Sequence, residues 1–397
     1  MKLASRMAKI KPSPTLAITA KAQALRAQGR NIIGFGAGEP DFDTPDNIKA
    51  AAVDAIRRGF TKYTPVGGTD ELKDAIRAKL KRDNGLEYDR SEIVVSCGAK
   101  HTLFNLLQVL FEEGDEVLIP SPCWVSYPDM VLLSGATPVI LETKESEGFK
   151  ADPGLLRSKI GAKTRAIILN SPSNPTGAAY TREELSALAS VILEGKIIVI
   201  SDDIYEKIVY DGFQFADIAS VRPDLRPFTM VVNGVSKSYS MTGWRIGYAA
   251  GDREIISAVT GFQSQNTSNP TSISQAAAVE ALNGDQSSLG IMVEEFRRRR
   301  DFMVEGLDGI PGMSCLRPQG AFYAFPNIAG LIGRSKGGRA IRGSGDLAEY
   351  LLDEVDVAVV PGLPFGSDSH IRLSYATSMA NIQEGLKRIK HAISLLK

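Results

Sequence analysis

The sequence contains little histidine and little cysteine. Among its 397 residues there are three of each. The histidines have no spacing typical of metal ligands, so we expect no metal site. The cysteines form no C-x-x-C pair and their number is odd, which favours a reducing compartment over a disulfide scaffold.

The chain also has no net charge and no long apolar run. Its 46 Lys and Arg balance 46 Asp and Glu, so no overall field attracts nucleic acid or an anionic membrane. No apolar run approaches the roughly 18 to 20 residues of a membrane span. The cationic start, MKLASRMAKIKPSP, is not followed by the apolar stretch of a secretory signal. We therefore expect a cytoplasmic protein, long enough for two domains, with neither nucleic acid nor membrane as a partner.

Short apolar runs alternate with amphipathic segments between about residues 92 and 250. The runs are rich in Val and Ile and apolar on both faces, as buried parallel strands are. Seven of them are EIVVS, DEVLIPS, TPVILE, RAIILN, KIIVIS, FTMVVN and RIGYAA. Helices are predicted between several runs, for example over 100–114 and over 181–195, where Thr181 and Glu184 form a capping-box pattern. The alternation predicts an α/β fold with helices on both faces of the sheet.

The pattern changes after residue 270. Long helices are predicted over 273–282 and 291–307, followed by the shorter strand signals GAFYAFP, VAVVPG and HIRLSYA and a closing helix. These elements indicate a second, α+β domain. The segment 330–346 is rich in Gly, Arg and Ser, which predicts a mobile loop. The four arginines at 297–300 we interpret as a solvated helix face, since acidic residues flank them.

Polar side chains follow several of the apolar runs. Asn174 lies in the turn after RAIILN, Asp202 and Tyr205 follow KIIVIS, and Lys237 follows FTMVVN. Ligands of open α/β sheets bind beyond the carboxyl ends of the strands, so we expect these groups to converge on one crevice. After EIVVS, Gly98 opens a helix whose free N–H groups suit a phosphate.

Each of these residues also has a simpler interpretation. Asn174 is typical of a turn, Asp202 of a helix cap, and Lys237 of a surface lysine whose stem covers apolar neighbours. Taken together they favour a binding site, because independent structural needs would not place all of them after strands of one sheet.

The stretch VSKSYSMTGWRIGY, residues 235–248, places Lys237 and Arg245 between flanks that look buried. Lys and Arg are almost never fully buried without partners. The pattern therefore indicates that both cations serve a ligand, although an acidic structural partner is the alternative for Arg245.

The motifs NPTG, SDDIYE and SKSYSMTGWRIGY together resemble those of the class I aminotransferases, which are pyridoxal-phosphate (PLP) enzymes. The resemblance extends from AGEPDFDTP at 37–45 to HIRLSYAT at 370–377. Any one motif alone is weak, and their order and spacing carry the resemblance. The sequence is most similar to the bacterial-type aspartate aminotransferases, some of which also act on prephenate.

This resemblance implies an architecture. A large PLP-binding domain would contain a mostly parallel seven-stranded sheet covered by helices, beside a smaller α+β domain. The implied limits are an N-terminal arm at 1–14, part of the small domain at 15–40, the large domain at 41–290 and the small C-terminal domain at 291–397. A homodimer with shared active sites is also implied, in which Tyr63 would reach the phosphate bound by the neighbouring subunit.

The resemblance further implies catalytic roles. Lys237 would bond covalently to PLP and then move a proton between the substrate Cα and the cofactor C4′. Asp202 would keep the pyridine nitrogen protonated, so that the ring accepts electrons from the substrate. Tyr205 and Asn174 would hydrogen-bond the ring oxygen.

The remaining cofactor contacts follow in the same way. Trp124, from SPCWVSY, would stack on the ring and, like Asn174, also contact the substrate. The other predicted cofactor-binding residues, mostly around the phosphate, are Gly98, Ala99, Lys100, Ser236 and Arg245. Gly234 stands where relatives often have a phosphate-binding serine, so this phosphate site would have one side chain fewer.

Substrate recognition is predicted from two further regions. Arg372 resembles the family arginine that binds the substrate α-carboxylate with both arms of its fork, and Gly38 would approach the same carboxylate by its backbone. Lys100 lies in the first turn of a helix, where a cation opposes the helix dipole. It is therefore either an exposed lysine without a role or, with Thr15 and Lys11, the site of a distal carboxylate. The second interpretation predicts aspartate and glutamate with their 2-oxo acids as substrates, and prephenate as a further one.

Several alternatives remain at this point. The same fold and cofactor support a β-lyase or a decarboxylase, and an aminotransferase for aromatic or neutral amino acids. A regulator carrying a DNA-binding head is disfavoured, because only 30 residues precede the strand-like NIIGF. A nucleotide-binding enzyme is disfavoured because GFGAGEP gives G-x-G-x-G rather than G-x-G-x-x-G.

Overall fold

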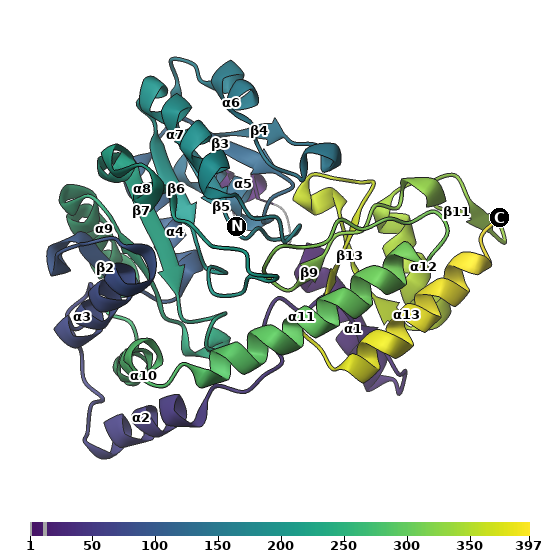
Figure 1. Ribbon diagram of the computed structural model, residues 1–397, viewed down its shortest axis with the longest axis horizontal. Coiled ribbons are helices and arrows are strands. Elements are labelled where there is room, and N and C mark those ends of the chain that lie inside the picture. Colours follow the sequence, from purple (N-terminus) through teal and green to yellow (C-terminus); the bar gives the residue numbers. More distant parts are fainter. Residues whose placement is uncertain (1, 11–13) are drawn as a thin grey trace.

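The computed structural model describes the backbone of residues 2–10 and 14–397, with all their side chains except those of 14–17 and 19. A seven-stranded sheet organises the first two thirds of the chain (Figure 1). Its strands lie in the spatial order β2 (Ile93–Ser96), β8 (Gly247–Ala250), β7 (Thr229–Gly234), β6 (Ile198–Asp202), β5 (Thr164–Asn170), β3 (Glu116–Ser121) and β4 (Thr137–Glu142). Neighbouring strands are parallel except that β8 runs antiparallel to β2 and β7.

Apolar side chains project from both faces of this sheet. Consecutive residues of one strand, such as Val199 and Ile200 of β6, belong to different core clusters, because successive side chains point to opposite faces of a sheet. One face is covered by α4 (Ala99–Leu110), α5 (Ser126–Ser134) and α9 (Arg253–Asn266). The other face is covered by α3 (Asp70–Lys79), α6 (Pro153–Lys159), α7 (Arg182–Gly195), α8 (Ile218–Val221) and α10 (Ser272–Asn283), with α2 (Asp46–Arg57) packed on α10.

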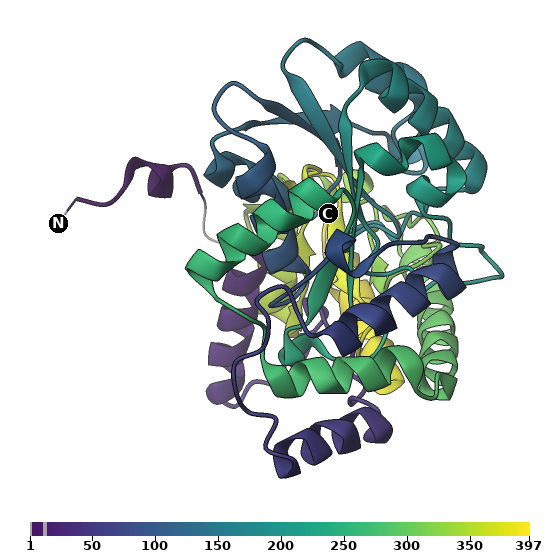
Figure 2. The same ribbon diagram turned by 90° about the vertical axis from the view of Figure 1, so that its left-hand side faces the viewer.

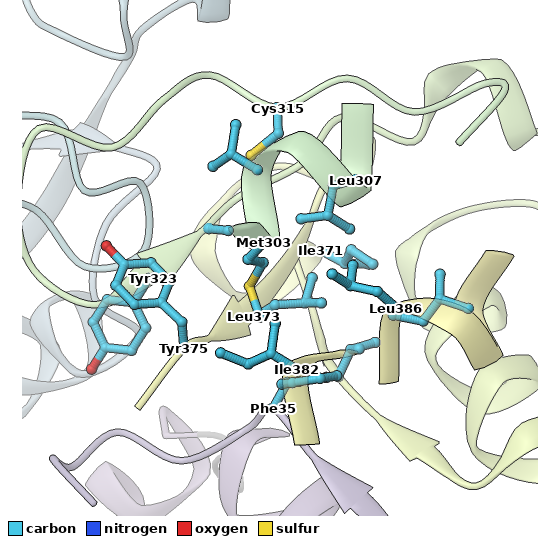
Figure 3. Packing of buried hydrophobic residues seen from close by; sticks show 14 of the residues in the cluster. Phe35, Met303, Leu307, Cys315, Tyr323, Ile371, Leu373, Tyr375, Ile382 and Leu386 are labelled. Atoms are coloured by element: carbon cyan, nitrogen blue, oxygen red, sulfur yellow. The ribbon is translucent and has the colours of Figure 1, made fainter. Parts of the chain in front are cut away.

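The C-terminal third forms a second layered unit. A three-stranded antiparallel sheet contains β13 (Val360–Pro361), β14 (Ile371–Ser374) and β9 (Tyr323–Ala324), and β1 (Ile33–Gly34) pairs with β12 (Val357–Ala358). Its helices are α1 (Pro14–Ala27), α12 (Ser344–Val355), α13 (Met379–Ser394) and part of α11 (Ser287–Asp308). Figure 3 shows their shared core, in which Phe35, Met303, Leu373 and Ile382 converge between strands and helices.

Helix α11 joins the two halves. Figure 1 shows it running from beside α10 into the C-terminal unit. The helix therefore passes through residue 290, where the sequence pattern put a domain limit, and the predicted limits stay predictions. Figure 2 shows that residues 2–10, with a short turn at Ser5–Ala8, project away from the body of the molecule.

The sequence-based prediction of the fold is largely confirmed. All seven apolar runs are strands of the large sheet, and the predicted mostly parallel arrangement is present. The capping box of α7 is also present: Glu184 N–H donates to Thr181 Oγ1 over 3.2 Å, and Thr181 N–H donates to the Glu184 carboxylate over 2.7 Å. The predicted loop 330–346 contains a small hairpin of β10 (Ser335–Lys336) and β11 (Arg339–Ala340).

One interpretation was wrong. The arginines at 297–300 do not form a solvated face: Arg299 and Arg300 are 7% and 0% exposed. Consecutive residues of a helix differ by about 100° in direction, so a run of four must turn toward the protein interior. Arg300 donates to both Asp211 carboxylate oxygens over 2.8 and 2.9 Å, which satisfies its buried charge.

Candidate active site

A cavity of about 390 Å³ opens at the carboxyl ends of the parallel strands. Residues from both halves of the chain line it, so it lies between the large sheet and the C-terminal unit. The lining residues that carry polar side chains are Lys100, Trp124, Ser126, Tyr127, Asn170, Asn174, Asp202, Tyr205, Ser236, Lys237, Thr242, Arg245, Tyr323 and Arg372. The structure thus brings together residues that are as far as about 270 positions apart, as expected at the strand ends of an open α/β sheet.

Lys237 extends into this cavity from the loop after β7. Its Nζ donates a hydrogen bond to the carbonyl oxygen of Gly38, which lies in the segment following β1. Burial lowers the pKa of Lys237 to about 8, with the positive charges of Arg245 and Arg372 acting in the same direction and Glu39 opposing them. A lysine with such a pKa supplies an unprotonated amine near neutral pH, which a nucleophile or a proton carrier requires.

Asp202 ends β6 and is almost fully buried. The hydroxyl of Tyr127 donates to Asp202 Oδ2 over 2.6 Å, and Ile204 N–H approaches Oδ1 at 3.4 Å. Burial raises the pKa of Asp202 to about 6, and the Tyr127 hydrogen bond limits this rise. A buried carboxylate with neutral donors only would be stabilised by a cationic N–H donor in the cavity.

Arg372 enters the cavity from β14. Its Nη1 donates to Asn174 Oδ1 over 2.9 Å and its Nη2 to the Gly36 carbonyl oxygen over 3.0 Å. Its buried Nε has no hydrogen-bond partner among the described residues. The guanidinium lies against the rings of Tyr323 and Phe365, with its carbon 4.5 and 5.0 Å from their centroids. This packing fixes the plane of the guanidinium, as bidentate binding of a carboxylate requires.

The amide side chain of Asn170 holds the Asn174 turn in place. Asn170 Oδ1 accepts from the backbone N–H of Asn174 over 2.9 Å, while Asn170 Nδ2 donates to the Asp202 carbonyl oxygen over 2.8 Å. The ends of β5 and β6 are therefore tied to each other directly below the cavity. This explains why polar residues follow both strands.

Tyr205 and Tyr323 meet at the side of the cavity, with 2.9 Å between their hydroxyl oxygens. Burial raises the pKa of Tyr205 well above its usual range, so its hydroxyl stays protonated and remains a donor. Tyr205 comes from the large sheet and Tyr323 from β9, so the pair also connects the two halves.

Arg245 lies over the start of α4. Its Nη1 donates to the Thr242 carbonyl oxygen over 2.7 Å, and no carboxylate lies within 4.0 Å of it in the described part of the chain. Gly98, which precedes α4, has φ of +94°, and a Cβ there would come within 2.5 Å of Arg245 Nη2. Both the positive φ and the closeness of the Arg245 side chain favour glycine at position 98. The guanidinium and the helix N-terminus thus form a cradle suited to a phosphate.

The structure explains the glycine at position 234. A Cβ on Gly234 would lie 2.8 Å from the Ile246 carbonyl oxygen and 3.1 Å from the Gly247 Cα, because β7 and β8 pair closely there. Any side chain at this position would require the two strands to move apart. The phosphate cradle therefore consists of Ser236, Arg245 and the start of α4.

Lys100 lies in the first turn of α4 and lines the cavity. Its Nζ is 4.7 Å from the centroid of the Trp124 ring, and it has no ion pair among the described residues. Burial and the charge of Arg245 lower its pKa. Both Lys100 and Trp124 are therefore available at the cavity wall.

The cavity has an excess of positive charge. Among the described residues, four cationic side chains line it, those of Lys100, Lys237, Arg245 and Arg372, against the single carboxylate of Asp202. Such a lining favours ligands with several negative charges.

Among the predicted residues that the structure describes, Tyr63 and Gly98 do not line this cavity. Tyr63 is 91% exposed on the surface of its own chain. Thr15 belongs to α1, but its side chain lies outside the described residues, as does Lys11 altogether. Their predicted roles stay predictions.

Sequence reasoning missed Tyr127 and Tyr323. Tyr127 follows Trp124 by three positions and lies in the first turn of α5, which brings both aromatic rings to one side; their centroids are 5.3 Å apart. This spacing was the available signal. Tyr323 lies in the strand pattern GAFYAFP, where nothing distinguishes it from a core residue.

Comparison with known proteins decides the family. The family model described as aminotransferase class I and II matches residues 30–389. The chain belongs to this family. It is 52% identical to the aspartate/prephenate aminotransferase of Nitrosomonas europaea, over 99% of this chain and 100% of the relative. It is 51% identical to the aspartate aminotransferase of Bacillus subtilis, over 99% of each chain.

Solved structures of aminotransferases agree with this assignment. An aspartate aminotransferase from Rhizobium meliloti superposes with a TM-score of 0.98 at 49% identity, with all of both chains covered. That of Thermus thermophilus, solved with maleate, gives 0.93 at 42% identity, covering 99% of this chain and 100% of the other. The predicted family, fold and enzyme class are confirmed.

PLP is the cofactor of this aminotransferase, as predicted, and the cavity residues fit it. Lys237 offers an amine of lowered pKa, Asp202 a buried carboxylate that lacks a cationic partner, and Arg245 a phosphate cradle. The substrates of aminotransferases are amino acids and 2-oxo acids. No helix among the described residues is long and apolar enough to cross a membrane.

Proposed function

We propose that this aminotransferase moves the amino group between aspartate or glutamate and the corresponding 2-oxo acids, with prephenate as a further acceptor. The observation that carries the proposal is the charge of the cavity, where four cations face one carboxylate. PLP brings a phosphate dianion, which would face Arg245, and the α-carboxylate of any amino acid would face Arg372. A monocarboxylic amino acid would leave Lys100 without a counter-charge, whereas the second carboxylate of a dicarboxylic substrate would supply one.

The proposed substrate contacts follow from the positions of Arg372 and Lys100 in the cavity. Arg372 binds the α-carboxylate through its planar fork, at which Nε has a free hydrogen. Lys100 binds the distal carboxylate from the opposite wall, beside Trp124. The names of the relatives from Nitrosomonas and Bacillus, and the maleate bound to the Thermus enzyme, support a dicarboxylate in this pocket.

The proposed chemistry uses residues of this chain around PLP, which when bound supplies an electron-accepting ring next to the substrate Cα. Lys237 would hold the cofactor through its amine and would carry the proton to and from the substrate Cα. Asp202 would hold the protonated pyridine nitrogen. Asn174 and Tyr205 would donate to the ring oxygen, and Tyr323 orients Tyr205 through its hydroxyl.

We also infer a homodimer in the cytoplasm. Tyr63 is exposed and is proposed to contact the phosphate bound by the partner subunit, and residues 2–10 project as an arm suited to a second chain. The three free cysteines favour a reducing compartment. Sedimentation of the holoenzyme at micromolar concentration tests the dimer; a monomer there would contradict it.

A substrate panel tests the proposed function. The purified holoenzyme is given aspartate, phenylalanine or alanine with 2-oxoglutarate, and the products are counted by mass spectrometry with ¹⁵N-labelled donors. We expect one ¹⁵N in glutamate for each aspartate consumed, and slower transfer from the other donors. Alanine and CO2 released from aspartate without any 2-oxo acid would instead indicate a decarboxylase, and pyruvate and ammonia released from a cysteine thioether without any 2-oxo acid would indicate a β-lyase.

A further inference from the structure

The run of four arginines in α11 separates into two different pairs. Arg297 and Arg298 bind acids of their own helix at the surface. Arg299, in contrast, is buried and reaches outside its helix: its Nη1 donates to Asp41 Oδ1 over 2.7 Å, while its Nε donates to Glu295 over 2.8 Å. Its guanidinium carbon also lies 5.1 Å from the centroid of the Phe42 ring. Arg299 therefore holds two consecutive residues of a segment that is remote in the sequence.

That segment, residues 36–44, passes along the active-site cavity. The Gly36 carbonyl oxygen accepts from Arg372, and the Gly38 carbonyl oxygen accepts from Lys237. Two cations proposed to act on substrate and cofactor thus contact two carbonyl groups of one short stretch.

Little else fixes this segment. Among the described residues, no backbone–backbone hydrogen bond joins residues 36–44 to the rest of the protein. Side chains tie it instead: besides the Arg299–Asp41 pair, Thr242 donates to Glu39 over 2.7 Å and Thr44 donates to the Ser240 carbonyl oxygen over 2.8 Å. The last two ties come from the loop that carries Lys237. Arg299 reaches the segment from α11, the helix that crosses between the two halves, and Phe296 of the same helix packs on Phe42.

We propose that Arg299 is a positioning residue, which holds the Gly38 carbonyl oxygen against Lys237 through its contacts with Asp41 and Phe42. The inference rests on the proposed role of Lys237. An accepting carbonyl group stabilises the ammonium form of the lysine, so its orientation sets how readily the amine loses its proton. When Arg299 is removed, the segment moves more freely and the Lys237 pKa falls further.

The test compares Arg299→Met with Arg298→Met. Arg298 is a matched control, since it neighbours Arg299 and binds the same Glu295 but is exposed. Chymotrypsin cleavage of the cofactor-free protein after Phe42, followed by mass spectrometry, should be at least about tenfold faster in Arg299→Met, which corresponds to the loss of one hydrogen bond to a charged group. The cleavage rate should be unchanged in Arg298→Met. Equal rates in both variants would overturn the proposal.

A second readout addresses Lys237 itself. The rate at which cofactor-free protein takes up PLP is measured against pH, and its midpoint should move to lower pH in Arg299→Met but not in Arg298→Met. Arg299→Lys, which can still reach Asp41 with one donor, should recover part of both effects. An unmoved midpoint would contradict the proposed link to the lysine.

A further variant distinguishes a folding defect from the loss of the contact between Arg299 and Asp41. Should Arg299→Met not fold, Asp41→Asn weakens the same contact while the arginine keeps its pair with Glu295, and it should accelerate cleavage after Phe42 in the same way. An unchanged cleavage rate would overturn the proposal. The cleavage measurement uses protein without PLP, so it stands even where Lys237 is found not to bind the cofactor. That finding would end the proposed role of Lys237 but not the anchoring of the segment.

Discussion

Tyr127 donates its hydroxyl hydrogen to the buried carboxylate of Asp202 across 2.6 Å, although the two residues are 75 positions apart. The hydrogen bond stabilises the carboxylate in a site where burial alone raises its pKa. Helix α5 and strand β6 thus cooperate at the group proposed to hold the pyridine nitrogen.

We expect Tyr127→Phe to weaken PLP binding about tenfold at neutral pH, because a hydrogen bond to a charged group contributes about 1.5 kcal/mol. The Asp202 pKa should rise above 6, so the loss should grow as the pH falls. Equilibrium dialysis of PLP between pH 5.5 and 8 measures both effects. Tyr180→Phe, in which the removed buried hydroxyl bonds the Ala151 N–H instead, is the control. Equal affinities in both variants would contradict the role of Tyr127.

The lowered pKa of Lys237 predicts a pH dependence of cofactor uptake. Only the unprotonated amine attacks an aldehyde, and burial shifts its protonation midpoint down to about 8. The rate of PLP uptake by cofactor-free protein should therefore rise with pH and level off above about 8. Stopped-flow absorbance at several pH values measures it. A rate still rising steeply at pH 10 would mean that the lysine has the pKa of a solvated amine.

Arg372→Lys should raise KM for both the amino acid and the 2-oxo acid. An ammonium replaces a planar fork whose plane is fixed by Tyr323 and Phe365, so one of two hydrogen bonds to the α-carboxylate is lost. That corresponds to about a 10- to 150-fold loss of kcat/KM. Steady-state kinetics with aspartate and with alanine should show similar losses, since both carry the α-carboxylate. A loss confined to aspartate would assign Arg372 to the distal carboxylate instead.

Lys100→Ala, unlike Arg372→Lys, should affect aspartate far more than alanine. The variant removes a cation at the cavity wall, so kcat/KM for aspartate should fall about 10- to 100-fold while that for alanine changes little. Lys100→Arg, which keeps the charge, should retain a preference for aspartate. Comparable losses for both amino acids would contradict the distal-carboxylate role.

Sequence patterns predicted the large sheet well for a physical reason. Buried parallel strands are apolar on both faces, and a run as short and apolar as KIIVIS is typical of such a strand. Lys237, Asp202 and Asn174 were predicted as site residues because they follow strands of one sheet, where several polar groups together favour a binding site. Arg372 was predicted from the family resemblance.

The contacts between distant residues could be found only from the folded structure. The sequence shows neither that Tyr127 reaches Asp202 nor that Arg299 turns inward to Asp41, because each contact joins elements that pack together only in the folded chain. The arginine run illustrates the limit: flanking acids indicated a surface, while the helix directed two of the four side chains into the interior.

Reduction of the holoenzyme with borohydride tests the central claim most directly. The reagent makes a bond between PLP and a lysine permanent, and peptide mapping by mass spectrometry then identifies the modified residue. The account predicts one pyridoxyl group per chain, on Lys237, and none in Lys237→Ala, whose turnover should fall by at least about 10²- to 10⁴-fold. Modification of Lys100 or another lysine, with Lys237→Ala still active, would contradict it.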